Sequence, residues 1–316
     1  MKTRRLGRTG LTVSVLGLGT GTRFGDGRSH DQAAATRLVR GALDLGVNYF
    51  DTAAMYLGAE EMLGQALQGI PRERYVVATK FFPRDDAGER LAPGMLRASV
   101  ERSLRRLRLE SIDVLQVHGC RPAWLAPTLA TLGEELEQLR HEGKFRFLGA
   151  GETILEDATH AMVPAAVDTG RFDQALIGYH LLSPSAEREA LPACAQRDVG
   201  VVAMVAVRRA LREPAFLREL LAAAVARGEI DPDEVEPRNP LGWLLDDDSP
   251  TLALAGLRFA VSHPAVACVI AGTLNLDHLR ENIAAVNASP LAPEKLARLR
   301  GLFRRADPRN WVLHRL

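Results

Sequence analysis

The clearest indication of the fold lies in residues 47–80, which read VNYFDTAAMYLGAEEMLGQALQGIPRERYVVATK. The two ends of this stretch, residues 47–51 and 75–80, are short apolar runs, and residues 60–68 between them repeat apolar side chains at helical spacing. Apolar strands separated by helices are typical of a parallel sheet that is buried on both faces. The stretch therefore predicts one strand–helix–strand unit.

The same rhythm continues toward both ends of the chain. We expect further strands at residues 13–17, 113–118, 145–149, 172–177, 199–205 and 266–270. Helices are expected at residues 31–45, 60–68, 93–109, 129–142, 155–168, 186–197, 251–262 and 277–286, with Asp31 as an N-cap and Gly46 as a stop. Eight such units predict an α/β protein with a closed (β/α)8 TIM barrel, and an open doubly wound sheet is the alternative.

Two regions fall outside this rhythm. Residues 211–228 are predicted to form an extra helix and residues 229–250 a long loop, so that 211–250 make up an insertion before the eighth strand. Residues 306–316 are predicted to form a C-terminal helix or tail. No linker-like segment separates these parts, so we expect residues 1–316 to form a single domain.

Composition narrows the class of protein. The chain has 316 residues, 47% apolar and 25% charged, with a net charge of +1. Such a chain can bury a core, and its charge gives no electrostatic reason to bind nucleic acid or an anionic membrane. The three cysteines (Cys120, Cys194 and Cys268) form no CxxC pair, which indicates buried thiols rather than a disulfide framework or a zinc site. We expect a cytoplasmic protein without a membrane span, and the sequence indicates no oligomeric state.

Four polar residues lie at or just after the carboxyl ends of consecutive predicted strands. Asp51 ends one strand, Tyr56 follows it, and Lys80 and His118 end the next two. In a barrel these ends share one rim, where active sites lie. The set suits carbonyl reduction: Tyr56 would be the general acid, Lys80 would lower its pKa, Asp51 would keep the lysine charged, and His118 would orient the carbonyl oxygen. None of these side chains can supply hydride, so a nicotinamide cofactor is required.

Several longer segments resemble the aldo-keto reductase superfamily. They are GVNYFDTAAMYLGAEE at residues 46–61, IDVLQVH at 112–118, RRLGRTGLTVSVLGLGTG at 4–21 and VIAGTLNLDHLREN at 269–282. The resemblance implies a (β/α)8 barrel, a catalytic tetrad of Asp51, Tyr56, Lys80 and His118, and a nicotinamide cofactor, usually NADPH.

The resemblance also implies a set of cofactor-binding residues, with departures. On the rim these are Gly19, Thr20, Gly21 and Asp51, and in the phosphate and adenine segment Gly272, Thr273, His278, Glu281 and Asn282. Gly151 and Glu152 stand where the family carries a Ser-Asn pair, Leu176 stands for a glutamine with Gln174 two residues away, and Met204 stands for an aromatic ring. A basic residue commonly pairs with the 2′-phosphate of NADPH, and Arg280 is the one certain positive charge in the phosphate segment. We therefore expect NADPH as the cofactor, with NADH also possible.

These patterns favour an NAD(P)-dependent oxidoreductase that reduces an aldehyde or ketone, or oxidises the matching alcohol or sugar. A cofactor-binding regulatory or sensor protein on the same barrel is the alternative, because the residues expected around the nicotinamide are altered. A metal-dependent hydrolase is a third possibility, although no metal ligand set is predicted. Trp124 and Trp311 are candidates for the substrate wall, and packing in a loop is the competing role for each.

Overall fold

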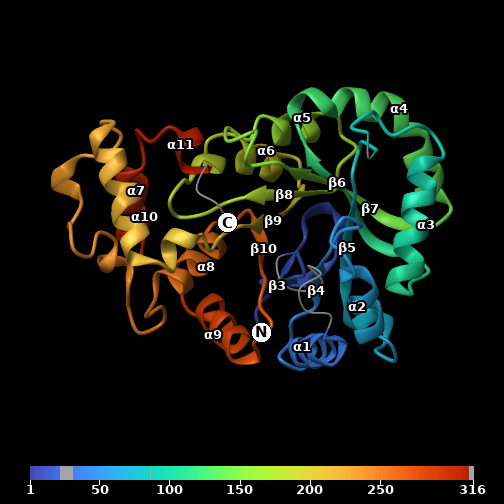
Figure 1. Cartoon of the computed structure of the whole chain (residues 1–316), viewed down its shortest axis with the longest axis horizontal. Helices are drawn as coiled ribbons and strands as arrows, with labels where there is room; N and C mark the ends of the chain where they lie inside the picture. The colour runs from blue at the N-terminus through green and yellow to red at the C-terminus, as the bar shows by residue number, and fades with distance from the viewer. Residues whose placement is uncertain (22–30, 86, 313–316) are drawn as a thin grey trace.

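The computed structural model describes residues 1–21, 31–85 and 87–312. Eight parallel strands close into a barrel in the order β10-β3-β4-β5-β6-β7-β8-β9 (Figure 1). Their bounds are β3 Leu16–Gly19, β4 Tyr49–Asp51, β5 Val76–Phe81, β6 Ile112–Cys120, β7 Phe145–Glu152, β8 Gln174–Gly178, β9 Gly200–Met204 and β10 Val266–Ala271. The pairing of β10 with β3, with Val269 opposite Leu16, closes the ring. The predicted TIM barrel is thus confirmed and the open sheet is wrong.

Helices cover the outside of the barrel, one after each strand. They are α1 Gln32–Asp44, α2 Ala59–Ala66, α3 Met95–Leu107, α4 Pro122–His141, α5 Met162–Asp168, α6 Ala190–Gln196, α8 Leu252–Ser262 and α9 Leu276–Asn287. The Asp31 carboxylate caps α1 by accepting a hydrogen bond from the Ala34 N–H, and Gly46 follows the helix with a positive φ of 86°. Both features are the predicted start and stop signals.

The amino-terminal segment differs from the prediction. Instead of one strand at residues 13–17, β1 (Thr3–Arg5) and β2 (Thr12–Ser14) form an antiparallel hairpin, and the barrel strand β3 begins only at Leu16. Leu6 and Val13 of this hairpin pack with Tyr49 and Val76 in a buried cluster inside the barrel. The hairpin therefore supplies apolar side chains to the interior, which explains why residues 13–17 look like one continuous apolar strand in the sequence.

Two predicted helices also have different limits. The helix expected at 129–142 begins earlier, at Pro122, because proline fits the first turn of a helix, where its missing N–H is not needed. The helix expected at 155–168 begins later, at Met162, because the preceding residues form turns in which His160 has a positive φ of 61°. Trp124 therefore lies in the first turn of α4 and not in a loop.

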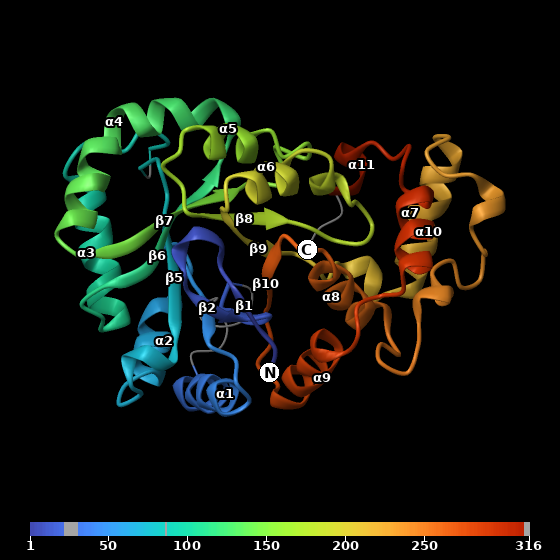
Figure 2. The same ribbon diagram turned by 180° about the vertical axis from the view of Figure 1, so that it is seen from behind.

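The predicted insertion before the eighth barrel strand is present. It contains the extra helix α7 (Pro214–Ala226) and a long segment with two short 3₁₀ turns, η5 (Pro232–Glu234) and η6 (Gly242–Leu244). The Asp246 carboxylate fixes this segment: it lies 2.6 Å from Arg258 of α8 and 2.8 Å from Lys295 of α10 (Pro293–Leu302). Figures 1 and 2 both show α7 and α10 side by side at the end of the molecule opposite α3.

Two further expectations concern the whole molecule. All three cysteines are buried and unpaired, as predicted. Within the three described ranges, no helix combines the length and the apolar character that crossing a bilayer requires. The predicted tail is helical at α11 (Pro308–Val312), and its last four residues, 313–316, lie outside the described residues.

Candidate active site

Four polar side chains meet where β4, β5 and β6 end. The Lys80 ammonium lies 2.6 Å from Asp51 Oδ2 and donates a second hydrogen bond of 2.7 Å to the Thr52 carbonyl. The same ammonium is 5.1 Å from the centre of the Tyr56 ring, and that ring is 5.7 Å from the His118 ring in an edge-to-face arrangement. The barrel thus brings all four residues of the predicted tetrad together.

The ion pair at the centre of the site is buried. Lys80 and Asp51 are only 1% and 2% exposed. Burial raises the pKa of Asp51, while Lys80 and a long hydrogen bond of 3.5 Å from Gln116 Nε2 act in the opposite direction. A buried charge is tolerated when it is paired and hydrogen-bonded. Asp51 therefore holds the Lys80 ammonium at a fixed place next to the face of the Tyr56 ring.

Tyr56 lies in the turn between β4 and α2, where burial and the Lys80 charge change its pKa in opposite directions. Burial raises the pKa of Tyr56 above its usual value, and Lys80, although it pulls the pKa down, does not outweigh that effect. Lys80 therefore acts on the Tyr56 pKa in the expected direction, but the sequence did not indicate the larger, opposite effect of burial. A phenol with a raised pKa keeps its proton at neutral pH, which is the form that a proton donor needs.

A bulge in β6 aims His118. Val117 is opposite Ala150, but Cys120 is opposite Glu152, so β6 has one more residue than β7 across this step. Gly119 takes the positive φ of 56° that the extra residue requires. Burial and the Lys80 charge lower the pKa of His118 to about 3. His118 is consequently neutral at physiological pH and can donate one hydrogen bond to an oxygen.

Two aromatic rings extend the site outward from His118. Phe82 packs edge-to-face on His118 at 6.4 Å and on Trp124 at 5.9 Å. The guanidinium groups of Arg84 and Arg121 lie 4.4 Å and 4.2 Å from the Trp124 ring. Trp124 is therefore one ring away from the tetrad, and its placement is consistent with a substrate wall. Phe82 is not among the residues expected from the sequence, and the one signal for it is its position two residues after Lys80.

The loop after β3 contacts the tetrad directly. The Thr20 N–H donates a 2.9 Å hydrogen bond to the Asp51 carbonyl, which ties this loop to the end of β4. A side chain at Gly21 would place its first carbon 3.0 Å from the Tyr56 ring, and one at Gly19 would meet nothing closer than 3.8 Å. The glycine at position 21 therefore keeps side-chain atoms away from the Tyr56 ring at this part of the rim.

The residues expected around the nicotinamide are arranged unequally. Leu176 is buried in the barrel interior and Met204 packs against the same cluster from its half-exposed position. The Glu152 carboxylate is already occupied, because His160 Nδ1 lies 3.0 Å from each of its oxygens and the Gly178 N–H donates to it at 2.6 Å. Gly151 has no side chain, so it can contact a cofactor only through its backbone N–H and carbonyl groups.

The segment after β10, in which the cofactor-phosphate residues are expected, turns into α9 (Leu276–Asn287) through side-chain hydrogen bonds to its backbone. Asn275 caps α9 by accepting a hydrogen bond of 2.7 Å from the Asp277 N–H, and the Thr273 hydroxyl accepts one of 3.1 Å from the Asn275 N–H. Arg280 turns back to pair with Asp277 at 2.6 Å. His278 and Glu281 are exposed, as is Gly272, and Asn282 is half-buried. The predicted residues therefore lie along one turn and the first part of one helix.

Trp311 has a structural environment. It is 2% exposed, packs edge-to-face on Phe303 at 4.9 Å, and its Nε1–H donates a 3.1 Å hydrogen bond to Glu229 of the insertion. A tryptophan with both its ring and its N–H satisfied inside the protein is a packing residue. The structure thus favours loop packing over the proposed substrate wall for Trp311.

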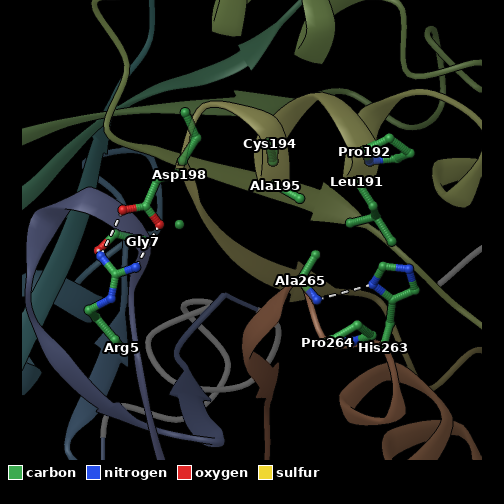
Figure 3. Close-up of a pocket in the computed structure, with 12 residues that line it drawn as sticks. Arg5, Gly7, Leu191, Pro192, Cys194, Ala195, Asp198, His263, Pro264 and Ala265 are labelled. Atoms are coloured by element: carbon green, nitrogen blue, oxygen red, sulfur yellow. Dashed lines mark hydrogen bonds and ion pairs between the residues drawn. The ribbon is translucent and has the colours of Figure 1, made fainter.

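One cavity of the described residues lies away from this site. It measures about 370 Å³ and is lined by residues that precede β9 and β10, among them Asp198, Val199, Pro264 and Ala265. Figure 3 shows Arg5 turned toward Asp198 on one side of it and His263 beside Ala265 on the other. These are the amino ends of the strands, whereas the tetrad lies at the carboxyl ends. In the described part of the chain, no group of three or more His, Cys, Asp or Glu side chains is placed to hold a metal ion.

Known proteins resemble this chain over most of its length. A model of the aldo/keto reductase family matches residues 15–304. The chain is 30% identical over 303 residues to L-galactose dehydrogenase of Arabidopsis thaliana, covering 90% of this chain and 87% of that protein. It is also 30% identical over 318 residues to the NADH-specific methylglyoxal reductase of Escherichia coli (strain K12), covering 91% and 94%.

Solved structures give the same result. An aldo-keto reductase from Bacillus halodurans in its holo form superposes with a TM-score of 0.72 at 27% identity, over 97% of each chain. An aldo/keto reductase from Klebsiella pneumoniae, in complex with NADP and acetate, superposes with a TM-score of 0.68 at 28% identity, over 96% of this chain and 95% of that one.

Proposed function

The chain belongs to the aldo/keto reductase family, and from this premise we propose that it reduces an aldehyde or ketone, or oxidises the matching alcohol or sugar, with NADPH or NADH. The observation that supports the proposal most strongly is the tetrad. Asp51 holds the Lys80 ammonium at 2.6 Å, and that ammonium lies under the ring of a phenol, Tyr56, at the open rim of the barrel.

The residues present suit a nicotinamide dinucleotide. Gly21 keeps the space beside Tyr56 free of a side chain, and the capped first turn of α9 offers backbone N–H groups of the kind that bind phosphate. Four large apolar side chains are exposed on the loops that follow β4, β7 and β10, at the carboxyl end of the barrel: Met55 (54%), Leu57 (70%), Leu155 (55%) and Leu274 (36%). When bound, the reduced nicotinamide supplies the hydride that no side chain can provide.

The side chains of the chain supply the proton. Tyr56 donates its phenolic proton to the carbonyl oxygen as negative charge develops there, and Lys80 stabilises the phenolate that is left. Neutral His118 donates a hydrogen bond to the same oxygen and fixes the direction of the carbonyl group. Asp51 is a positioning residue, since it acts by holding Lys80 in place. Together these groups provide general acid catalysis next to a pre-oriented positive charge.

We propose NADPH as the preferred cofactor, with NADH accepted as well. Arg280 is the one certain positive charge in residues 269–282, which contain the phosphate turn (residues 272–275), and the pair that it forms with Asp277 is exposed at both ends (57% and 77%). Exposed ion pairs contribute little free energy, so Arg280 can leave Asp277 for a phosphate at small cost. The E. coli relative is named NADH-specific and the Klebsiella structure holds NADP, so members with similar sequences are associated with either cofactor.

The alternative is a sensor that binds the cofactor with little turnover. The feature that favours it is Glu152, whose carboxylate is occupied by His160 and Gly178 and is therefore not free to hold the nicotinamide amide. We include a cytoplasmic location in the main proposal, because three buried, unpaired cysteines suit a reducing compartment. A small carbonyl compound or alcohol is the expected partner.

The experiment measures binding and turnover on the same preparation. NADPH and NADH are titrated against the intrinsic tryptophan fluorescence, and oxidation of each is then followed at 340 nm on a panel of aldehydes and ketones. We expect saturable quenching by at least one cofactor and turnover on at least one carbonyl compound. Tight binding with no turnover on any member of the panel would favour the sensor, and no binding of either cofactor would overturn both proposals.

A further inference from the structure

A second cavity, separate from the tetrad, lies between the loop after β8 and the C-terminal helices. It measures about 250 Å³. Its walls come from the 3₁₀ turn η3 (Ser185–Glu187), from α10 and from the residues that lead into α11. The polar lining consists of two serines, three arginines and one glutamate: Ser183, Ser185, Arg188, Arg300, Arg304 and Glu187. We refer to these six residues as the arginine pocket.

The arginine pocket carries a surplus of positive charge. Its carboxylate, Glu187, is taken by Arg300, whose Nε lies 2.6 Å from Glu187 Oε2. Asp307 is nearby but pairs with Arg309 at 2.8 Å, and its lowered pKa is due mainly to Arg309 and only slightly to Arg188. The guanidinium groups of Arg188 and Arg304 make no hydrogen bond or ion pair with any of the described residues. Two positive charges therefore line the cavity without a protein partner among those residues.

Hydroxyl groups with unused hydrogen-bonding capacity line the same cavity as these charges. Ser183 and Ser185 are 6% and 8% exposed, and their hydroxyl oxygens are 3.2 Å apart. A hydroxyl can donate one hydrogen bond and accept two, so Ser183, with this one partner, retains capacity for a ligand. Ser185 is fixed by a second contact, because its hydroxyl oxygen lies 2.8 Å from His160 Nε2.

A buried relay continues from Ser185 toward the barrel. His160 Nδ1 lies 3.0 Å from the Glu152 carboxylate, which ends β7. His160 adopts a left-handed backbone conformation with φ of 61°, which is uncommon for a residue other than glycine. The Ser185 hydroxyl at the edge of the cavity is thus held by a buried histidine that is itself held by Glu152.

We propose that the arginine pocket binds a phosphate group, either inorganic phosphate or the phosphate of a small phosphate ester. The reasons are the two unpaired guanidinium groups, which match the charge of a phosphate dianion, and the serine hydroxyls beside them. Arginine side chains bind phosphate oxygens through paired N–H donors, and charge-assisted hydrogen bonds are the strong ones. This site does not use Tyr56, Lys80 or the phosphate turn before α9, so it is independent of the proposed reductase activity.

Calorimetric titration at constant ionic strength tests the site, with inorganic phosphate and glycerol 3-phosphate as the two probes. We expect saturable binding of at least one probe by the wild-type protein and by Tyr56→Phe. Arg188→Gln and Arg304→Gln should each weaken binding at least about tenfold. The matched control is Arg305→Gln, which removes the same charge from the adjacent, exposed residue outside the cavity and should change the affinity less than twofold.

The two probes identify the source of the phosphate. Tighter binding of glycerol 3-phosphate indicates an esterified ligand, and equal or tighter binding of inorganic phosphate indicates the free ion; both support the site. Binding is repeated with NADPH present at saturation, to separate this cavity from the cofactor's own phosphate contacts. Absence of saturable binding, displacement of phosphate by NADPH, or equal weakening in Arg305→Gln and Arg304→Gln would overturn the proposal.

Discussion

Removal of one charge from the buried Asp51–Lys80 pair should destabilise the protein far more than removal of both. The two groups are 2.6 Å apart. At an effective dielectric constant of about 20, two unit charges at this distance attract each other by about 6 kcal/mol, most of which replaces the hydration that the charges lose. Asp51→Asn keeps the shape of the side chain but leaves the Lys80 ammonium buried without a counter-charge, which should cost about 3–5 kcal/mol of unfolding free energy.

A double-mutant cycle measures this effect. The four proteins are wild type, Asp51→Asn, Lys80→Met and the double variant, and their unfolding free energies come from urea titration followed by tryptophan fluorescence. Because the double variant buries no charge, we expect it to be more stable than Asp51→Asn alone, with a coupling energy of about 3 kcal/mol. If Asp51→Asn costs less than about 1 kcal/mol and the two changes add, then Lys80 is not a buried, charged group and the electrostatic account of the site is wrong.

Three smaller predictions follow from individual contacts. Gly21→Ala places a methyl group 3.0 Å from the Tyr56 ring, so kcat on a carbonyl substrate should fall about tenfold while stability is kept; an unchanged kcat would show that the ring can move freely. Burial lowers the pKa of His118 from 6.5 to about 3, so between these pH values His118 is protonated in the unfolded chain but neutral in the native state. The unfolding free energy therefore falls as the pH drops from 6.5 toward 3, and the contribution of this residue is about 2 kcal/mol at pH 5. His118→Asn should therefore lose less unfolding free energy than wild type between pH 7 and pH 5, and an equal loss would contradict the prediction. Trp311→Phe removes the hydrogen bond to Glu229 and should cost about 1–2 kcal/mol of stability without changing KM, whereas a tenfold change in KM would restore a role at the substrate.

The tetrad could be predicted from sequence because three of its members lie at the ends of apolar runs and the fourth, Tyr56, follows one of them by five residues. That position is local information, and the barrel converts it into proximity at one rim. The direction of the Tyr56 pKa could not be predicted, because it depends on how deeply packing buries the ring compared with how close it brings Lys80. Both effects act on the same group with opposite sign, and the sequence contains only the identity of the partners.

Other features depended on backbone geometry that the sequence signals only weakly. The bulge that aims His118 is marked by Gly119 alone, and the earlier start of α4, which places Trp124 on a helix, is marked by Pro122. The partner of Glu152 lies eight residues away and reaches it through a turn with a left-handed residue, His160. No periodicity in the sequence predicts that contact, which is why Glu152 looked free to hold the cofactor.

In the proposed mechanism Tyr56 gives its proton to the substrate, while Lys80, Asp51 and His118 prepare it to do so. Single-turnover oxidation of bound NADPH by an accepted aldehyde, measured for wild type and Tyr56→Phe, tests this most directly, with NADPH affinity determined in parallel. We predict that the rate for Tyr56→Phe falls at least about a hundredfold, with a less than twofold change in the dissociation constant for NADPH. A variant that retains more than half of the wild-type rate would contradict the claim.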